Sequence, residues 1–548
     1  MPTFTPSYDP VAGSLSLSAL CGILPLLVFF VLLGVFKVKT HWCAIISLGV
    51  ALAVSIFGFT MPTTLALLSA SYGFVFGFFP ILYIIIAAVW LYNLTEASGR
   101  SADVRAAFNV VGRGDQRVQG LLIAFSFCGL LEGLAGFGAP VAIVGAMLVT
   151  VGINPIKAAI ATIVGNAINV GFGAMAIPVT TAARIGGAEV NRVAWMMGHL
   201  TPYIAVFVPL ILLFILDGMR GVKQLWSVAV VSGAVTAAAH LWCASYFSYE
   251  LTAVVAALLG FIATTAYLLI FKPTTPDECK SDATSELSAS RAIIGLMPYW
   301  LVVIIFGIAK LWTLGVNLPS VLKSTDLTFN WPGLYGKLLK MDGNVSADAK
   351  FTFASLSSPG TLIAITAIIV IVVYSATSSG GKFPFTVGQG FKTLGKTIYD
   401  LRIAILTIST VMALAYVMNF SGQTASIGKW LAGAGAGFAF VSPILGWIGT
   451  AVAGSATSAN ALFANLQSTA AAQVGADPSL LLAANTIGGG IGKIVSPQNL
   501  AIAATAVGEK DIEATLLKKV SGWSIGFLLV LCLLTGLGSL GVMPGISS

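Results

Sequence analysis

The stretch LLEGLAGFGAPVAIVG, residues 130–145, places one carboxylate, four glycines and a proline inside a long apolar segment. Glu132 is costly at such a depth in hydrocarbon and such groups usually have a function. Glycine and proline interrupt helices, and a backbone that leaves the helix inside a membrane leaves N–H and C=O groups without partners. This is tolerated only where the backbone is buried in protein or faces water. The stretch therefore predicts a polar cavity within a membrane.

The composition of the whole chain supports a membrane environment. Hydrophobic residues make up 57% of the 548 residues, charged residues make up 9%, and the mean hydropathy is +0.95, outside the range of soluble globular domains. The net charge of +8 is dispersed among short loops, which argues against nucleic-acid binding. The six cysteines form no C-x-x-C pair and the three histidines are far apart, so we expect no metal site and no cofactor.

About twelve apolar runs are long enough to cross a hydrocarbon core of ~30 Å. They lie near 15–36, 42–60, 63–93, 158–180, 199–216, 224–247, 251–271, 292–314, 361–378, 401–420, 481–506 and 520–541. Two further apolar regions, 118–152 and 434–475, are too long for one helix and are interrupted by small residues. We expect two re-entrant hairpins there, although two tight spans in each region would keep the same topology. The predicted fold is an all-α polytopic membrane protein.

The positively charged loops set the expected topology. Lysines and arginines occur near 37–39, 100–117, 220–223, 382–396 and 510–519, and the positive-inside rule assigns such loops to the cytoplasm. With twelve spans and two re-entrant hairpins, all five loops fall on the same side. The chain is then a multi-pass protein with both the N-terminus and the C-terminus outside.

Two similar segments indicate an internal repeat. GNAINVGFGAMAIPV, residues 165–179, and ANTIGGGIGKIVSPQ, residues 484–498, each place an asparagine 12 residues before a proline with glycines between. We expect an inverted-topology repeat of units 1–216 and 292–548, joined by two helices and a flexible polar linker within 217–291. Each unit has a hairpin (118–152, 434–475) followed by a broken helix (158–180, 481–506). Inverted repeats with interrupted helices are typical of secondary transporters, whose site lies near the membrane midplane.

Glycines and prolines shape the expected hairpins and helix breaks. Close helix packing is the alternative role for each of these glycines, but four such segments in symmetric order favour a cavity. The residues concerned are Gly136, Gly138, Pro140, Gly171, Gly173, Pro178, Gly488, Gly490 and Pro497.

Four segments also carry a family resemblance. LEGLAGFGAPVAI (131–143), FGAMAIP (172–178), SANALFANLQ (458–467) and AANTIGGGIGKIVSPQNLAIA (483–503) resemble signature segments of the bacterial lactate permease family. The resemblance extends along nearly the whole chain. It implies a transporter, not an enzyme, that takes up L-lactate, D-lactate and glycolate with protons across the bacterial inner membrane. By analogy with ion transporters, it also implies a scaffold domain and a mobile transport domain of the elevator type.

The resemblance gives the candidate residues their roles. Glu132 is the expected proton carrier, and a structural role at the hairpin tip is the alternative. Lys493 is expected to attract the substrate carboxylate or to pair with an acid in the opposing hairpin. Polar groups near half-helix N-termini, which favour anions, are expected to bind substrate or to cap helices, and two aromatic residues are expected to form an apolar wall. The polar groups are Asn166, Asn485, Ser455, Thr457 and Ser458, and the aromatic residues are Phe137 and Phe172.

One position departs from the expected family pattern. The chain has Gly-Ser-Ala-Thr-Ser at 454–458, where we expect the family to have aspartate at the third position. Ala456 is therefore expected to remove a titratable group that couples protons to transport and to leave Lys493 without its partner. A sodium/proton exchanger could use the same architecture, but it would need a carboxylate at this break. The expected partners are a small carboxylate, protons and the lipid bilayer, and the oligomeric state stays open.

Overall fold

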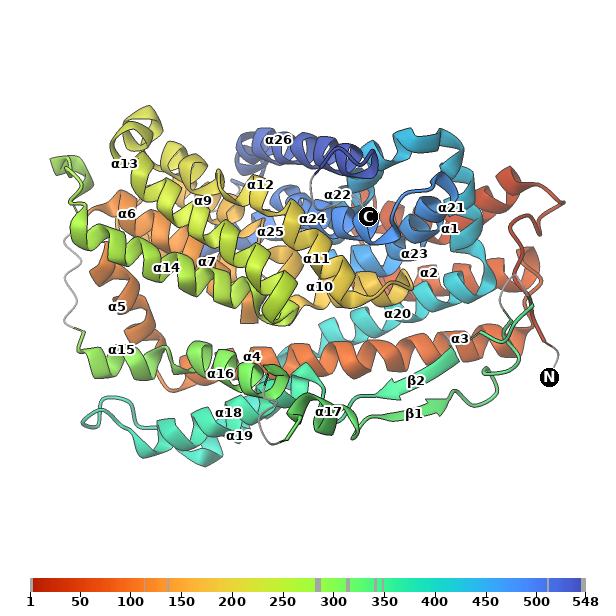
Figure 1. Ribbon diagram of the computed structural model, residues 1–548, viewed down its shortest axis with the longest axis horizontal. Coiled ribbons are helices and arrows are strands. Elements are labelled where there is room, and N and C mark those ends of the chain that lie inside the picture. The colour runs from red at the N-terminus through yellow and green to blue at the C-terminus, as the bar shows by residue number, and fades with distance from the viewer. Residues whose placement is uncertain are drawn as a thin grey trace.

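The computed structural model describes residues 3–112, 114–134, 136, 138–280, 287–311, 316–339, 343–346, 349–509 and 512–543. It is built mainly from helices that run along the long axis of the molecule and pack side by side (Figure 1). Helices are the expected choice for such an apolar chain, because a helix satisfies its backbone hydrogen bonds within one segment.

The helices of the first part of the chain follow one another with short connections. They are α1 (Leu15–Gly34), α2 (Thr40–Ala53), α3 (Thr63–Phe76), α4 (Tyr83–Ala97), α5 (Ser101–Val111), α6 (Gln116–Leu121), α7 (Cys128–Leu134), α8 (Ala139–Thr150), α9 (Pro155–Asn166), α10 (Gly173–Ile185), α11 (Val190–Leu200), α12 (Pro202–Ala205), α13 (Val208–Trp242) and α14 (Thr252–Ile270). Wider π-helical turns join α3 to α4 and α6 to α7.

The second part of the chain adds twelve helices and two strands. They are α15 (Ala289–Gly295), α16 (Met297–Leu311), α17 (Leu318–Lys323), β1 (Leu327–Asn330), β2 (Lys350–Phe353), α18 (Pro359–Ala376), α19 (Val387–Asp400), α20 (Arg402–Ser421), α21 (Gln423–Leu431), α22 (Phe438–Ala453), α23 (Ala456–Val474), α24 (Pro478–Gly492), α25 (Pro497–Ala506) and α26 (Glu513–Ser539). The strands β1 and β2 pair antiparallel, with Phe329 opposite Phe351. The all-α prediction omitted this pair, because no turn motif links two strands so far apart in sequence.

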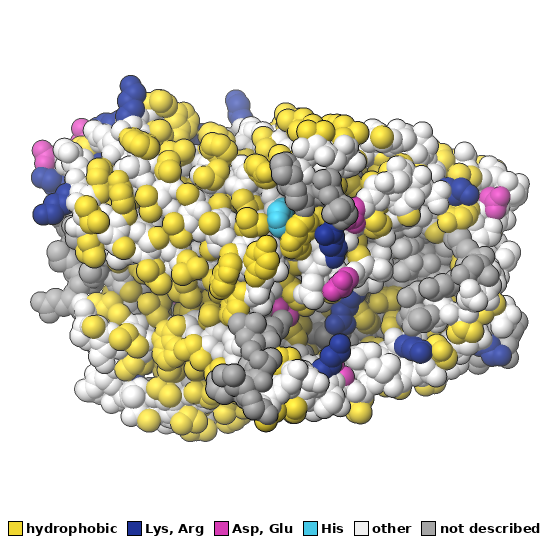
Figure 2. Space-filling model, viewed as in Figure 1, with side chains coloured by type: hydrophobic (Ala, Val, Ile, Leu, Met, Phe, Trp, Pro, Cys, Tyr) yellow, Lys and Arg dark blue, Asp and Glu magenta, His cyan; other side chains and the backbone are white. Residues whose placement is uncertain are grey.

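The number of membrane-spanning helices agrees with the prediction of about twelve. Among the described residues, ten helical segments are long and apolar enough to cross a membrane, and two bent pairs raise the number to 12. The ten include Gln116–Leu134 and Gln423–Ala453, which overlap the predicted hairpin regions, and they do not include the predicted span 481–506. Large hydrophobic side chains are also exposed on the surface, such as Phe57 at 85% and Ile270 at 88%. Yellow hydrophobic side chains cover much of the left half of Figure 2, and charged side chains lie mainly at the left edge and in the right half. Such a surface suits contact with lipid.

The two predicted helix breaks are present. α9 and α10 are bent by 60° at the break between them, and α24 ends at Gly492 before α25 begins at Pro497. The glycines of α24 serve close packing: a Cβ at Gly488 would lie 2.4 Å from the carbonyl oxygen of Pro443, and one at Gly490 would lie 2.7 Å from that of Ala167. Both helix breaking and helix packing therefore account for the glycines in these segments.

The two predicted hairpin regions contain sharp turns, but their arms are unequal. Before the first turn, the helical segment Gln116–Leu134 has 19 residues, all buried except Gln116, whereas α8 has 12. The second turn lies between α22 and α23 at Gly454 and Ser455. The first arm is thus longer than the short half-helix expected from the sequence, because the π-helical turn over residues 122–127 continues it without a break.

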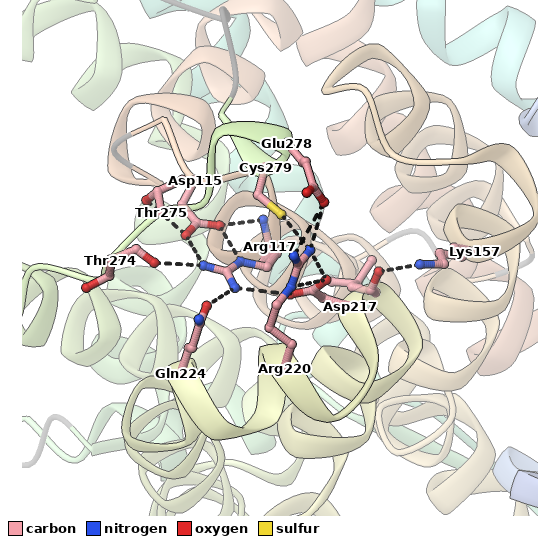
Figure 3. Close-up of polar contacts among 11 residues, drawn as sticks. Asp115, Arg117, Lys157, Asp217, Arg220, Gln224, Thr274, Thr275, Glu278 and Cys279 are labelled. Atoms are coloured by element: carbon pink, nitrogen blue, oxygen red, sulfur yellow. Dashed lines mark hydrogen bonds and ion pairs between the residues drawn. The ribbon is translucent and has the colours of Figure 1, made fainter.

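The polar linker before α15 was expected to be flexible, and its described segment 271–280 is anchored instead (Figure 3). Arg117 is buried and donates to Asp115 Oδ2 at 2.8 Å, to Asp217 Oδ2 at 3.1 Å and to the carbonyl oxygen of Thr274 at 3.2 Å. Arg220 pairs with Glu278 at 3.4 Å. A polar composition did not reveal these ion pairs, because their partners lie in distant helices.

Candidate functional site

A cavity of about 520 Å³ lies where the hairpin turns and the helix breaks meet. One part of its wall comes from Gly136 and Gly138 between α7 and α8, the start of α10 (173–174), the α22–α23 turn (453–458) and the first turn of α25 (498–502). The rest includes residues 39–41 at the start of α2 and 403–408 in α20. The cavity lies at the interrupted helices, where the sequence predicted one. Charged and hydroxyl side chains line it together with aliphatic ones, and its volume suits a small ligand.

An ion pair lies in the wall of this cavity. Lys493 Nζ lies 3.1 Å from Glu132 Oε1 and 3.3 Å from Oε2, and the two residues are 7% and 2% exposed. Asn166 Nδ2 donates to Glu132 Oε2 at 2.8 Å, and the Cys128 thiol donates to Asn166 Oδ1 at 3.3 Å. Each buried charge therefore has a partner, as a low-dielectric site requires. The expectation that Ala456 leaves Lys493 unpaired is wrong, because Glu132 is its partner.

The helices α8, α23 and α25 begin at the cavity wall close to the ion pair. α8 follows Gly138, whose φ of +87° only glycine adopts readily. α23 is capped by Ser455 Oγ, which accepts from the Ser458 N–H at 3.2 Å, and α25 by Ser496 Oγ, which accepts from the Asn499 N–H at 3.3 Å. Helix N-termini carry partial positive charge and unpaired N–H groups. Around a neutral ion pair, three of them make the cavity attractive to an anion.

The start of α10 is strained where it meets the ion pair. Ala174, Met175 and Ala176 have φ values of 43°, 59° and 59°, in the left-handed region that costs about 1–2 kcal/mol per residue. Gly173 precedes them, and a Cβ there would lie 2.7 Å from Glu132 Oε1. The lack of a side chain at position 173 therefore lets the backbone approach the carboxylate.

The structure brings most of the predicted residues to the cavity. Ala456 is 5% exposed and lines it. The other predicted residues that line it are Glu132, Lys493, Ser455, Thr457, Ser458, Gly136, Gly138, Gly173 and Pro178. Pro140 and Pro497 occupy the first turns of α8 and α25, where proline is well tolerated.

Other predicted residues lie away from the described cavity wall. Asn485 donates to Asn460 Oδ1 at 2.7 Å and accepts from Gln467 Nε2 at 3.0 Å, within a buried network between α23 and α24. Phe172 is fully buried and lies against His240, with ring centroids 5.9 Å apart. Asn166 reaches the site only through Glu132. A Cβ at Gly171 would lie 2.6 Å from Met197 Cε, which indicates packing, and Phe137 lies outside the described residues.

The sequence did not single out several residues of the wall. Residues 39–41 and 403–408 carry no glycine or buried charge that would mark them, and only folding brings them to the hairpin turns. Gln498 and Asn499 lie within a resembling segment, but a polar pair at a helix start usually serves as a cap.

Known proteins resemble the chain along most of its length. The model of the L-lactate permease family matches residues 18–540. The glycolate permease GlcA of Escherichia coli is 36% identical over 98% of each chain, and the L-lactate permease of Bacillus subtilis is 35% identical over 97% of this chain and 98% of its own. The solved structure of MtrF from Neisseria gonorrhoeae, an antimetabolite efflux pump, covers 87% of this chain and 85% of its own at 14% identity and a TM-score of 0.46.

Proposed function

The chain belongs to the L-lactate permease family, and on that premise we propose that it carries L-lactate, D-lactate and glycolate into the cell together with protons. It is a multi-pass membrane transporter and not an enzyme. The observation that carries the proposal is the Glu132–Lys493 pair in a cavity where α8, α23 and α25 begin.

The substrate carboxylate binds at the helix N-termini and near Lys493. A buried site disfavours net charge, because moving an unpaired ion out of water costs several kcal/mol. The Glu132–Lys493 pair is neutral by itself. When a monocarboxylate anion occupies the cavity, protonation of Glu132 restores neutrality, and Lys493 then has the substrate as its partner. One anion therefore enters with one proton.

The cavity faces the cytoplasm in this conformation. Its wall includes Lys39 at the start of α2 and Ile403 at the start of α20, next to loops that the positive-inside rule assigns to the cytoplasm. The loops near 100–117 and 220–223 meet through the ion pair Arg117–Asp217, and Arg100 lies over the Phe383 ring in the loop at 382–396. This supports a common side for them and an inner-membrane topology with both termini outside.

The hairpins and broken helices form the moving part. The cavity wall combines α7, α8 and α10 from unit 1–216 with α23 and α25 from unit 292–548, which supports an inverted repeat around a central site. In this proposal these elements are the transport domain of an elevator, the remaining helices form the scaffold, and residues 217–291 connect the two units.

Uptake into liposomes tests the proposal. Purified protein in liposomes with an alkaline interior is expected to accumulate labelled L-lactate, and collapse of the pH gradient is expected to release it. Glu132→Gln keeps the shape of the side chain but cannot release a proton, so this variant is expected to exchange lactate without accumulating it. Glu250→Gln is the matched control, because Glu250 is also a buried carboxylate but is held by Ser248 Oγ at 2.8 Å and lies outside the cavity.

Three outcomes would contradict the proposal. Accumulation by Glu132→Gln equal to that of the wild type would assign Glu132 a structural role. Accumulation driven by a sodium gradient alone would show that sodium, and not the proton, is the coupling ion. Proton flux in exchange for sodium without any lactate would favour the ion exchanger.

A further inference from the structure

Asn499 is a cavity residue that the ion pair does not use. It lines the cavity from the first turn of α25 and is 3% exposed. Its backbone N–H is satisfied by Ser496 Oγ, whereas its side-chain Oδ1 has no hydrogen-bond partner among the described residues. A buried amide oxygen without a donor is unfavourable. A ligand in the cavity that brings a donor to this oxygen, once the buried amide turns toward the cavity, is therefore favoured.

Two other acceptors of the wall, Glu132 and Ser455, already have donors. Both oxygens of Glu132 accept from Lys493, and Oε2 also accepts from Asn166. Ser455 Oγ accepts from the backbone of α23. Asn499 thus offers an acceptor that is not committed to these contacts, and its neutral amide does not repel an anion.

Asn499 also has a suitable place relative to the donors. In a 2-hydroxy acid, the hydroxyl is on the carbon next to the carboxylate, so its acceptor has to lie close to the groups that bind the carboxylate. Asn499 is in the first turn of α25, whose N-terminal N–H groups favour an anion. Lys493 lies in the break just before this helix and lines the same cavity.

We propose that Asn499 accepts a hydrogen bond from the C2 hydroxyl of the substrate and so selects 2-hydroxy acids over their deoxy analogues. The inference rests on the proposed function, because it assumes that small monocarboxylates bind in this cavity. A site built around a substrate hydroxyl discriminates against an analogue without it, since a buried polar group of the protein is then left unpaired.

Binding of matched acid pairs tests the inference. The affinities of purified protein for L-lactate and propionate, and for glycolate and acetate, are measured by calorimetry. The wild type is expected to prefer each hydroxy acid by about tenfold or more. Asn499→Leu keeps a similar volume without an acceptor, so it is expected to lower lactate affinity about tenfold and to leave propionate affinity within about twofold. Asn499→Ala makes the same test if leucine does not fit.

Two controls separate the possible causes. Asn154→Leu replaces another asparagine at a helix start, which caps α9 outside the cavity, and is expected to leave both affinities unchanged. Lys493→Met is expected to weaken lactate and propionate alike. A parallel loss of lactate and propionate in both Asn499 variants would overturn the inference, as would a wild type that does not prefer the hydroxyl. A wild type that binds none of the four acids would overturn the proposed function as well.

Discussion

Lys493 Nζ lies within 3.3 Å of both carboxylate oxygens of Glu132, although the two residues are 361 positions apart in the chain. Glu132 belongs to the first hairpin and Lys493 to the second helix break. The pair therefore joins the two halves of the molecule inside the cavity. Any ligand anion that approaches Lys493 competes with Glu132 for it.

Replacement of Lys493 by methionine tests this competition. The variant is expected to bind lactate at least about tenfold more weakly, because a charge-assisted interaction with the anion is lost. Lactamide has no charge, so the substitution is expected to lower its affinity less than that of lactate. Inhibition of labelled lactate exchange by each compound gives the two affinities.

The variant also leaves Glu132 as a buried charge without a cation, which destabilises the fold. The double variant Lys493→Met/Glu132→Gln removes this second effect and is the control. Equal losses for lactate and lactamide in the double variant would assign Lys493 to a tether between the halves.

Gly173→Ala tests the close approach of backbone to the carboxylate. The added Cβ would lie 2.7 Å from Glu132 Oε1, so the variant is expected to displace Glu132. We expect it to lower the free energy of unfolding by about 1–3 kcal/mol and to reduce transport. Gly522→Ala is the matched control, since a Cβ there meets nothing within 4 Å. Thermal unfolding in detergent and lactate uptake are the measurements. A Gly173→Ala protein that behaves like Gly522→Ala would show that the backbone at position 173 moves aside freely.

The sequence predicted those parts of the site that carry a local chemical signal. Glu132 and Lys493 are charges in apolar segments, and the breaks before Gly173 and Pro497 follow from glycine and proline. The contact between Glu132 and Lys493 has no such signal, because hydropathy does not say which distant charges meet. Sequence reasoning gave Lys493 two possible partners, the substrate carboxylate and an acid of the opposing hairpin, and Glu132 is the acid that lies against it.

Other features were hidden for different physical reasons. The left-handed turn at residues 174–176 consists of alanine and methionine, which favour right-handed helices, so only tertiary packing explains it. Phe172 was expected at the substrate because aromatic residues suit an apolar wall, but helix packing buries it against His240. The linker composition predicted flexibility, and ion pairs to Arg117 and Arg220 anchor it.

The reactivity of Cys279, which lies in the linker segment 271–280, tests whether this segment is anchored in solution. Burial raises the pKa of its thiol above the ordinary value, although the nearby Arg117 guanidinium opposes the shift. Because the thiolate is the reactive form, Cys279 is expected to react with iodoacetamide more slowly in the folded protein than in protein denatured by detergent. A single-cysteine variant that retains only Cys279 allows the measurement.

The pH dependence of the reaction rate shows whether the fold raises or lowers the pKa of the Cys279 thiol. The rate in the folded protein is expected to rise at higher pH than in the denatured protein. The unfolded chain also releases the thiol proton first as the pH rises, so the fold loses stability above the ordinary thiol pKa. Identical profiles in both states would show that residues 271–280 are not held in solution.

The last prediction concerns Ala456, the first residue of α23. Its side chain lines the same cavity as Glu132 and Lys493, so Ala456→Asp would place a second carboxylate near Lys493 and at a helix N-terminus, which favours a negative charge. Two carboxylates would then compete for the Lys493 ammonium group, and substrate binding would change the proton affinity of both. We expect the present chain to bind lactate but to accumulate it slowly, and Ala456→Asp to raise the rate of proton-driven uptake severalfold. Ala456→Asn, which has the same shape without the charge, is expected to give no increase. If the aspartate variant and the asparagine variant transported lactate equally between about pH 5 and about pH 8, position 456 would serve packing alone, and Glu132 would remain the proposed carrier of the proton.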